Sequence, residues 1–408
     1  MTWDPPVRGV KALVYDVRTY GAKGNGTTDD TAAIDSAITA ALVTGGTAFA
    51  PPGTYEVKGL KFTYTGKRLQ LAGAAQAAKL VNTATTSSNT TTTLYVTGGN
   101  AIGGDWLEIA DLYLEGSATC GMGITLATGS QGRLTNLRID GFTAAAGWGV
   151  GINMGNHSFD WLVTNPVITN CAYAGILIQG AANANVILGG WLYNMPSGSF
   201  GVRISTSNGN RIVGTIIQGT ANKPSGVELS GSANSIIGCW IEANTVGVYA
   251  NETGSLIDGC FFSDNLTDIA VEASSRDLVV RNCHFASATP KITLVAGSTN
   301  TLIESCTGLT LADITDASGA SFAVRNCPGI NPVGVVTVAV PASGAAVAAA
   351  GYDRTFYVTA STTSVTLAIQ NGPTITVPAS ACVPVFVPAG KTLTPTYTTA
   401  PTWVVEGN

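Results

Sequence analysis

Charged residues are scarce in this 408-residue sequence: Asp, Glu, Lys and Arg make up 11% of it, and the formal net charge is −5. Lys and Arg form no cluster, so we exclude an extended nucleic-acid-binding surface. No apolar stretch is long enough to span a membrane, and the N-terminus "MTWDPPVRGVKALVYD" lacks the basic start and apolar run of a secretory signal. We therefore expect no membrane insertion and synthesis in the cytoplasm without a signal peptide.

Cysteine and histidine are also few, with eight cysteines, two histidines and no CxxC pair. Structural zinc sites use closely spaced cysteine pairs, and small disulfide-rich secreted domains carry cysteine at a higher density. The sequence therefore predicts neither a metal site nor any other cofactor. Five cysteines instead recur every 21 to 23 residues, which indicates a repeating fold: Cys239, Cys260, Cys283, Cys306 and Cys327.

Two further series keep the same period. Glycine followed by an apolar, any and an apolar residue occurs at positions 151, 175, 201, 226 and 247, and short segments such as "NVIL" and "NSII" stay in phase with it. Each segment is too short for a helix and is bounded by Gly or Asn, which tolerate the positive φ of tight turns. Three short strands in each repeat predict a parallel β-helix, whose coils stack about 4.8 Å apart.

The alternation of side chains along a strand places the cysteine series inside this solenoid. In "CWIE", "CFFS" and "CHFA" the cysteine and the residue two positions later face the interior. Leu112, Leu137 and Thr215 hold the same position in earlier repeats. We therefore interpret the cysteines as a buried stack of small apolar groups, not as disulfides or metal ligands.

The start of the chain resembles a known superfamily. Residues 15–57, "YDVRTYGAKGNGTTDDTAAIDSAITAALVTGGTAFAPPGTYEV", are similar to the opening of pectate-lyase-like proteins, which include polysaccharide-degrading enzymes and phage tailspikes. The resemblance implies a right-handed parallel β-helix capped by a short N-terminal helix. Asp29 and Asp30 stand where that helix begins, and a side-chain oxygen there can cap free amides. The HG and RIK motifs of polygalacturonase-like enzymes are absent, so the resemblance transfers the fold and not a mechanism.

The coil spacing ends near "NCPGINPVG", and the remaining residues alternate apolar and polar positions around an Asn371-Gly372 turn. We predict an all-β protein with three parts. These are an N-terminal extension (1–14), a parallel β-helix domain with its capping helix (15–330) and a small antiparallel, β-sandwich-like C-terminal domain (331–408). The C-terminal part resembles modules that follow a pectate-lyase-like helix in phage tail proteins.

The first outward residue of each repeat forms an apolar and aromatic column that includes Trp191, Ile216, Trp240 and Phe261. A soluble monomer seldom exposes so large an apolar patch. We predict that these four side chains form an oligomer interface, and the resemblance implies a homotrimer. Stacking of the same column against sugar rings is the alternative.

The next outward column contains the candidate catalytic residues. Glu115 and Asp140 lie one coil apart, at a separation compatible with the carboxylate pair of a retaining glycosidase. They are the leading pair, with Glu242 and Glu228 in reserve. The alternative is that Glu115 and Asp140 are exposed acids without a catalytic role.

Three further side chains are candidates for substrate binding. Arg203 stacks on Glu228 one coil later, either as a surface ion pair or as a ligand for a substrate carboxylate. Tyr113 in the preceding column and Tyr193 further along the acidic column are candidate platforms for a sugar ring.

The sequence and its resemblance together predict a phage tailspike or minor tail protein that recognises a host-surface glycan as a homotrimer. Its partners would be the host polysaccharide and other tail proteins, and its location would be the virion. Two alternatives remain open. One is a polysaccharide-degrading glycoside hydrolase or lyase, and the other is a structural tail component without glycan activity.

Overall fold

The structure of the protein is a computed structural model. It describes residues 13–64, 68–84, 92–98, 106–144, 149–219, 224–288, 290–318, 322–330, 334–336, 338–349, 353–388 and 390–407. Residues 1–12 of the predicted N-terminal extension lie outside these ranges, as do residues 331–333 at the predicted start of the C-terminal part.

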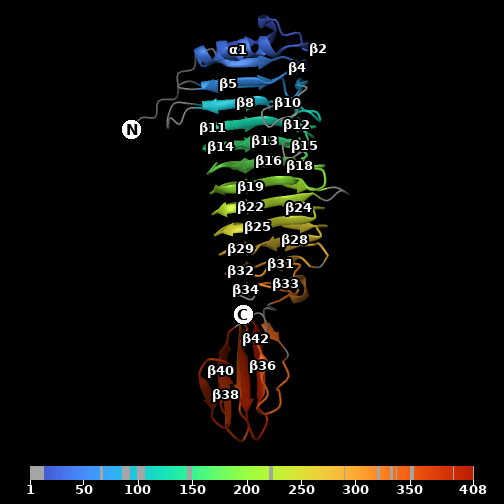
Figure 1. Cartoon of the computed structure of the whole chain (residues 1–408). Coiled ribbons are helices and arrows are strands. Elements are labelled where there is room, and N and C mark those ends of the chain that lie inside the picture. The colour runs from blue at the N-terminus through green and yellow to red at the C-terminus, as the bar shows by residue number, and fades with distance from the viewer. Residues whose placement is uncertain are drawn as a thin grey trace, which may run out of the picture.

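The chain winds into a parallel β-solenoid whose coils each pass through three faces, which we call sheets A, B and C (Figure 1). Sheet B carries the outward columns discussed below. Its described strands are β2 (Asn25–Asp29), β4 (Gly53–Val57), β7 (Ala78–Asn82), β10 (Leu112–Glu115), β12 (Arg138–Asp140), β15 (Val167–Thr169), β18 (Trp191–Tyr193), β21 (Ile216–Gln218), β24 (Trp240–Glu242), β27 (Phe261–Ser263) and β30 (His284–Phe285).

Sheets A and C form the other two faces and are also parallel. Sheet A consists of β1 (Val14–Asp16), β3 (Thr47–Ala50), β6 (Arg68–Gly73), β9 (Trp106–Ala110), the second half of β11 (Met122–Thr135), β14 (Ser158–Thr164), β17 (Val186–Leu188), β20 (Arg211–Val213), β23 (Ser235–Ile237), β26 (Leu256–Asp258), β29 (Val279–Arg281), β32 (Thr301–Glu304) and β34 (Phe322–Arg325). Sheet C consists of β5 (Leu60–Tyr64), β8 (Thr92–Gly98), the first half of β11, β13 (Val150–Met154), β16 (Ala174–Gln179), β19 (Phe200–Asn208), β22 (Ser225–Ser232), β25 (Val246–Thr253), β28 (Thr267–Val271), β31 (Ile292–Leu294) and β33 (Ile314–Asp316). The fold class predicted from the repeats is confirmed.

From β9 to β29, a left-handed residue follows each strand of sheet A and turns the chain into sheet B. This position has a positive φ in successive coils, and its occupants are the residue types that tolerate such a φ best. They include Asn136, Gly214, Gly238, Gly259 and Asn282. The sequence therefore repeats Gly or Asn here because the backbone repeats.

The cysteine series directly follows this turn and faces the interior. All five of its members are buried thiols: Cys239, Cys260, Cys283, Cys306 and Cys327. Contact with the Cys260 thiol and burial together raise the pKa of Cys239 above its ordinary value. The column is a set of packing residues, as predicted.

An internal ladder of asparagines, not foreseen from the sequence, satisfies backbone amides inside the coils. The Oδ1 atom of Asn210 accepts the amide N–H of Asn185 at 3.0 Å, and Asn234 accepts that of Asn210 at 2.9 Å. All three side chains are buried. Each asparagine thus joins one coil to the next where the turn leaves a donor without a strand partner.

The helix α1 (Thr31–Thr44) covers the N-terminal end of the stack, next to the short 3₁₀ helix η1 (Val17–Tyr20) (Figure 1). Its buried residues Ile34 and Ile38 close the core. Capping is confirmed for Asp29, which accepts the Thr31 amide at 3.1 Å. It is wrong for Asp30, whose buried carboxylate accepts amides of the preceding loop instead, at 2.7 and 3.0 Å.

Two antiparallel sheets follow the last coil, which contains η2 (Leu311–Asp313) (Figure 1). Sheet D has the strand order β35 (Gly334–Val336), β42 (Thr402–Gly407), β37 (Arg354–Thr359) and β40 (Cys382–Val387), and sheet E the order β36 (Val347–Ala348), β41 (Thr392–Thr396), β38 (Val365–Ile369) and β39 (Thr374–Val377). Phe356 and Leu367 belong to their shared core, which is separate from that of the solenoid. Within the described residues, no helix has the length and apolar character needed to cross a bilayer.

Candidate functional site

The strand register of sheet B aligns the outward residues as predicted. One column runs through Tyr113, Arg138, Val167, Trp191, Ile216, Trp240, Phe261 and His284. The neighbouring column, two residues further along each strand, runs through Glu115, Asp140, Thr169, Tyr193, Gln218, Glu242 and Ser263. The structure divides these columns into two chemically different halves.

In the N-terminal half, cations cover the aromatic ring of Tyr113. The Lys79 ammonium lies 4.9 Å from the centre of this ring, and the Arg138 guanidinium lies 4.7 Å from it. Lys79 also forms an ion pair with Glu115. A sugar that stacked on Tyr113 would have to displace these cations.

The predicted pair Glu115 and Asp140 lies side by side and shares one donor. The Tyr113 hydroxyl donates to Glu115 at 3.0 Å and approaches Asp140 at 3.4 Å, and Asn170 donates to the other oxygen of Asp140 at 2.8 Å. Burial, followed by the hydrogen bond to the Glu115 carboxylate, raises the pKa of Tyr113. Stacking is therefore confirmed, and a catalytic role for the pair stays a prediction.

In the C-terminal half, the columns form a groove of about 310 Å³. Its walls are Trp191, Ile216 and Trp240, whose side chains are between 40% and 46% exposed, and its polar edge is Gln218 and Glu242. Indole rings two coils apart with an aliphatic side chain between them make a mostly apolar hollow that is open to solvent.

A chain of hydrogen bonds fixes both indoles at the polar edge. Trp191 donates through Nε1 to Gln218 at 3.1 Å, and Gln218 donates to Glu242 Oε1 at 2.6 Å. Trp240 donates through Nε1 to Glu242 Oε2 at 2.7 Å, and Ser263 donates to the same oxygen at 3.3 Å. With their N–H groups held by one column, the rings cannot rotate freely, and the groove is preorganised.

Further aromatic side chains extend the groove on both sides. Tyr193 stacks on Trp191, with ring centres 4.3 Å apart and planes 28° apart. Phe261 lies 4.6 Å from Trp240, and His284 stacks on Phe261 at 5.2 Å. The structure thus brings the predicted residue Tyr193 together with the predicted interface column.

Arg203 and Glu228 lie away from this groove, on sheet C. They are register partners and form an ion pair of 2.7 Å. The Arg203 guanidinium also lies over the rings of Phe200 and Tyr173, at 5.0 and 5.3 Å, and donates to the Tyr173 hydroxyl. The structure therefore does not unite this predicted pair with Glu115, Asp140 or the groove.

Two side chains of the candidate site were not singled out from the sequence. Gln218 links the indoles of Trp191 and Trp240 through its hydrogen bond to Glu242, and Lys79 neutralises the charge of Glu115 in an ion pair. The signal for Gln218 is its place two residues after Ile216, in the column that also holds Glu242. Lys79 carries a weaker signal, because only the register of β7 with β10 places it beside Tyr113.

Two protein families match the chain. The family described as "Rhamnogalacturonase A/epimerase, pectate lyase-like" matches residues 14–186, and "Right handed beta helix region" matches residues 191–309. No curated protein matches the chain.

Solved structures with the same fold include proteins from a virus and a bacterium. ORF18 of Geobacillus virus E2 is 16% identical, with a TM-score of 0.57, and the match covers 95% of this chain and 78% of that one. DFA-IIIase from Arthrobacter chlorophenolicus A6, in complex with GF2, is 13% identical with a TM-score of 0.60, over 78% of this chain and 92% of that one. At such identities the likeness is one of fold.

The parallel sheets, the repeated coils and the two family matches together define a right-handed parallel β-helix protein. The pectate-lyase-like match over residues 14–186 and the right-handed β-helix match over residues 191–309 place the solenoid in the right-handed β-helix superfamily.

Proposed function

We propose that the protein is a phage tailspike or minor tail protein that recognises a host-surface glycan through the groove between Trp191 and Trp240. The observation that carries this proposal is the groove itself, an apolar hollow of about 310 Å³ with a hydrogen-bonding edge. Its support in the comparisons is the viral ORF18 structure, whose match extends over 95% of the chain and thus reaches the C-terminal sheets. Residues 331–408 form a domain of their own in this proposal.

The groove has the chemistry that a sugar requires. The C–H face of a pyranose packs on an aromatic ring, while its hydroxyls need hydrogen-bond partners at the edge. Trp191 and Trp240 are two coils apart, which is roughly 9 to 10 Å at the usual strand spacing. The Gln218 carbonyl and the Glu242 carboxylate keep acceptor capacity beyond the bonds they already receive. The negative charge of Glu242 favours a neutral sugar at this position.

A homotrimer that buries Trp191, Ile216, Trp240 and Phe261 is the second candidate for the same face. The observation in its favour is the continuous ladder of Trp240, Phe261 and His284, which extends beyond the groove. In this proposal the glycan would bind elsewhere, because the subunits cover the indoles.

The enzymatic alternative is a polysaccharide-cleaving hydrolase or lyase. Its support is the match to a rhamnogalacturonase and epimerase family and the similar fold of DFA-IIIase. Glu115 and Asp140 lead the catalytic candidates, with Glu242 and Glu228 in reserve. A structural tail component without glycan activity is the third alternative.

The proposed function is tested with glycans isolated from host envelopes, incubated with the wild type, Trp240→Ala and the control Leu266→Ala. Leu266 is also an exposed large apolar residue, at 55%, but it does not line the groove. Loss of one ring contact of about 1.5–3 kcal/mol should weaken binding at least tenfold in Trp240→Ala alone. New reducing ends or unsaturated uronates would show cleavage. Binding that Trp240→Ala leaves unchanged would overturn the proposed site.

A further inference from the structure

The C-terminal sheets contain a second pocket, of about 400 Å³, that no part of the solenoid lines. Residues of two edge strands line it, β39 of sheet E and β40 of sheet D. These two strands follow one another in the sequence. Its volume falls in the range of about 300–1,000 Å³ that is typical of small-molecule sites. The lining residues are Ile369, Gln370, Asn371, Gly372, Pro373, Ile375, Pro384, Val385, Phe386, Pro388 and Lys391.

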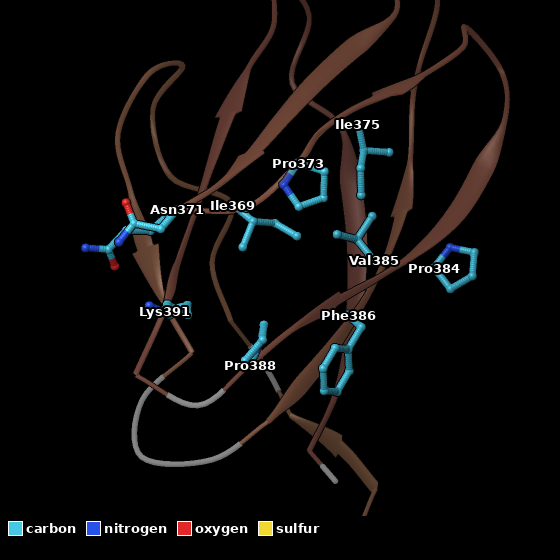
Figure 2. Close-up of a pocket in the computed structure, with 11 residues that line it drawn as sticks. Ile369, Asn371, Pro373, Ile375, Pro384, Val385, Phe386, Pro388 and Lys391 are labelled. Carbon is cyan, nitrogen blue, oxygen red and sulfur yellow. The ribbon is translucent and has the colours of Figure 1, made fainter. Parts of the chain in front are cut away.

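Polar and apolar side chains are separated within this pocket. Figure 2 shows Asn371 and Lys391 on one side of it and Ile375, Val385 and Pro384 on the other. The apolar side presents flat or rigid surfaces of proline and isoleucine. A ligand that fits this division has a hydrogen-bonding, charged end and a compact apolar face.

Lys391 is one of very few charged residues in the C-terminal part of the chain. Residues 331–408 contain only four charged side chains: Asp353, Arg354, Lys391 and Glu406. Glu406 accepts a hydrogen bond from Tyr357, and Arg354 donates to the Ala348 carbonyl. Among the described residues, no carboxylate pairs with the Lys391 ammonium within salt-bridge distance. The pocket therefore offers a cation to an anionic ligand.

The backbone of β40 argues against a peptide strand as the occupant. Strand addition requires a row of free N–H and C=O groups on an edge strand. Pro384 in the middle of β40 has no N–H, and Pro388 follows the strand. A ligand held by side chains fits this edge better than an added strand.

We propose that this pocket binds an acidic sugar residue of the uronate class. In this proposal the sugar carboxylate forms an ion pair with Lys391, and the sugar hydroxyls form hydrogen bonds with the side-chain amides of Gln370 and Asn371. The apolar face of the sugar ring packs on Phe386. This inference rests on the proposed glycan recognition and adds to it a second site of opposite charge preference, because the solenoid groove presents Glu242. The two sites together select a glycan that carries both neutral and acidic residues.

The test is saturation-transfer-difference NMR on the full chain with sodium D-glucuronate and, as the neutral match, D-glucose. In the Trp240→Ala background, where the solenoid groove no longer competes for the neutral sugar, the protein should transfer saturation to glucuronate at least fivefold more strongly than to glucose. The difference should disappear in Lys391→Met and in Phe386→Ala, and it should shrink in high salt because the ion pair is screened. Val404→Ala is the matched control, since Val404 is 47% exposed and Phe386 51% exposed on the same sheet, and only Phe386 lines the pocket.

Equal transfer to both sugars in the Trp240→Ala background, or glucuronate binding there that survives Lys391→Met, would overturn the inference. Trp240→Ala separates it from the proposed function, because that variant alters the solenoid groove and leaves the C-terminal pocket intact. Glucuronate binding retained in Trp240→Ala supports the second site even where the solenoid groove binds no glycan. Loss of glucuronate binding in Trp240→Ala, with Lys391→Met unaffected, would assign the acidic sugar to the solenoid instead.

Discussion

The indole N–H of Trp240 donates to the carboxylate of Glu242 at 2.7 Å, between side chains two positions apart on the same outward face of β24. The same carboxylate also accepts from Gln218 at 2.6 Å. Glu242, a reserve catalytic candidate from the sequence, thus orients the groove through Trp240 and through Gln218. In the proposed function it is a positioning residue.

Glu242→Gln should therefore weaken glycan binding without unfolding the coil. The amide of glutamine replaces one acceptor oxygen by an N–H donor. Either the Trp240 indole N–H or the Gln218 amide N–H then loses its acceptor, at a cost of about 1–3 kcal/mol. We expect the affinity for the glycan to fall roughly fivefold or more and the tryptophan emission of the protein to change. Both are measured by titrating the protein with the glycan and following its tryptophan fluorescence. Glu272→Gln, an isosteric change outside the groove, should alter neither. Equal effects of both changes would contradict the positioning role.

The buried cysteine column gives a prediction about reactivity. Seven of the eight thiols are buried, and Cys382 is exposed. Titration of the native protein with a thiol reagent should find about one reactive group, and denaturation should release the rest. Cys260→Asp should destabilise the protein by several kcal/mol because it buries an unpaired charge, whereas Cys382→Asp should not. Rapid labelling at Cys239 or Cys260 in the native state would contradict the buried stack.

The sequence predicts the coils well because one physical rule acts in every repeat. The left-handed turn favours Gly or Asn, and the two-residue alternation after it fixes which side chains face outward. Both outward columns follow from these two facts alone. The position of Lys79 over Tyr113 does not, because Lys79 belongs to an earlier coil whose register depends on a loop of different length. The link from Trp191 to Gln218 depends on side-chain torsions that no residue pattern encodes.

Assembly provides the next test, because the trimer and the glycan groove compete for the same indoles. Burying Trp191, Ile216 and Trp240 between subunits would contribute roughly 1.5 to 3 kcal/mol for each side chain. If these side chains form the interface, Trp240→Glu should shift the mass measured by light scattering toward the monomer at micromolar concentration. The control Leu266→Glu should leave it unchanged. A wild-type trimer that Trp240→Glu does not affect would remove this column from the interface.

Glu115 and Asp140 are tested by isosteric replacement on any glycan that the wild type cleaves. Their shared donor, the Tyr113 hydroxyl, places the two carboxylates within reach of one proton. If the pair performs general acid-base catalysis, Glu115→Gln and Asp140→Asn should each lower turnover by about 10²-fold or more. Asp258→Asn, which affects an ion pair with Arg281 on sheet A, serves as the control. Unchanged turnover in both variants would exclude the pair.

Glu252 provides a prediction on stability because its carboxylate is buried and forms no ion pair with a described residue. It is only 3% exposed, and the Ser255 hydroxyl and amide beside it lower its pKa by less than burial raises it. Burial raises the pKa of Glu252 to about 7, from 4.5 for an ordinary glutamate. Between these two pH values the folded state binds a proton that the unfolded state has released. The folded state therefore loses stability as the pH rises from about 4.5 to 7, and the loss is complete above that range.

Glu252→Gln should remove this penalty, because the amide stays neutral at every pH. We expect the variant to be more stable than the wild type at pH 8, by an amount on the order of 1–3 kcal/mol, and nearly equal to it at pH 4.5. The buried Asp268, whose pKa burial raises to about 6, acts in the same direction, so the comparison must be between variant and wild type at each pH. Urea denaturation followed by circular dichroism measures both, with Glu272→Gln as the control. A stability difference between Glu252→Gln and wild type that is the same at pH 4.5 and pH 8 would show that the buried carboxylate does not titrate between them.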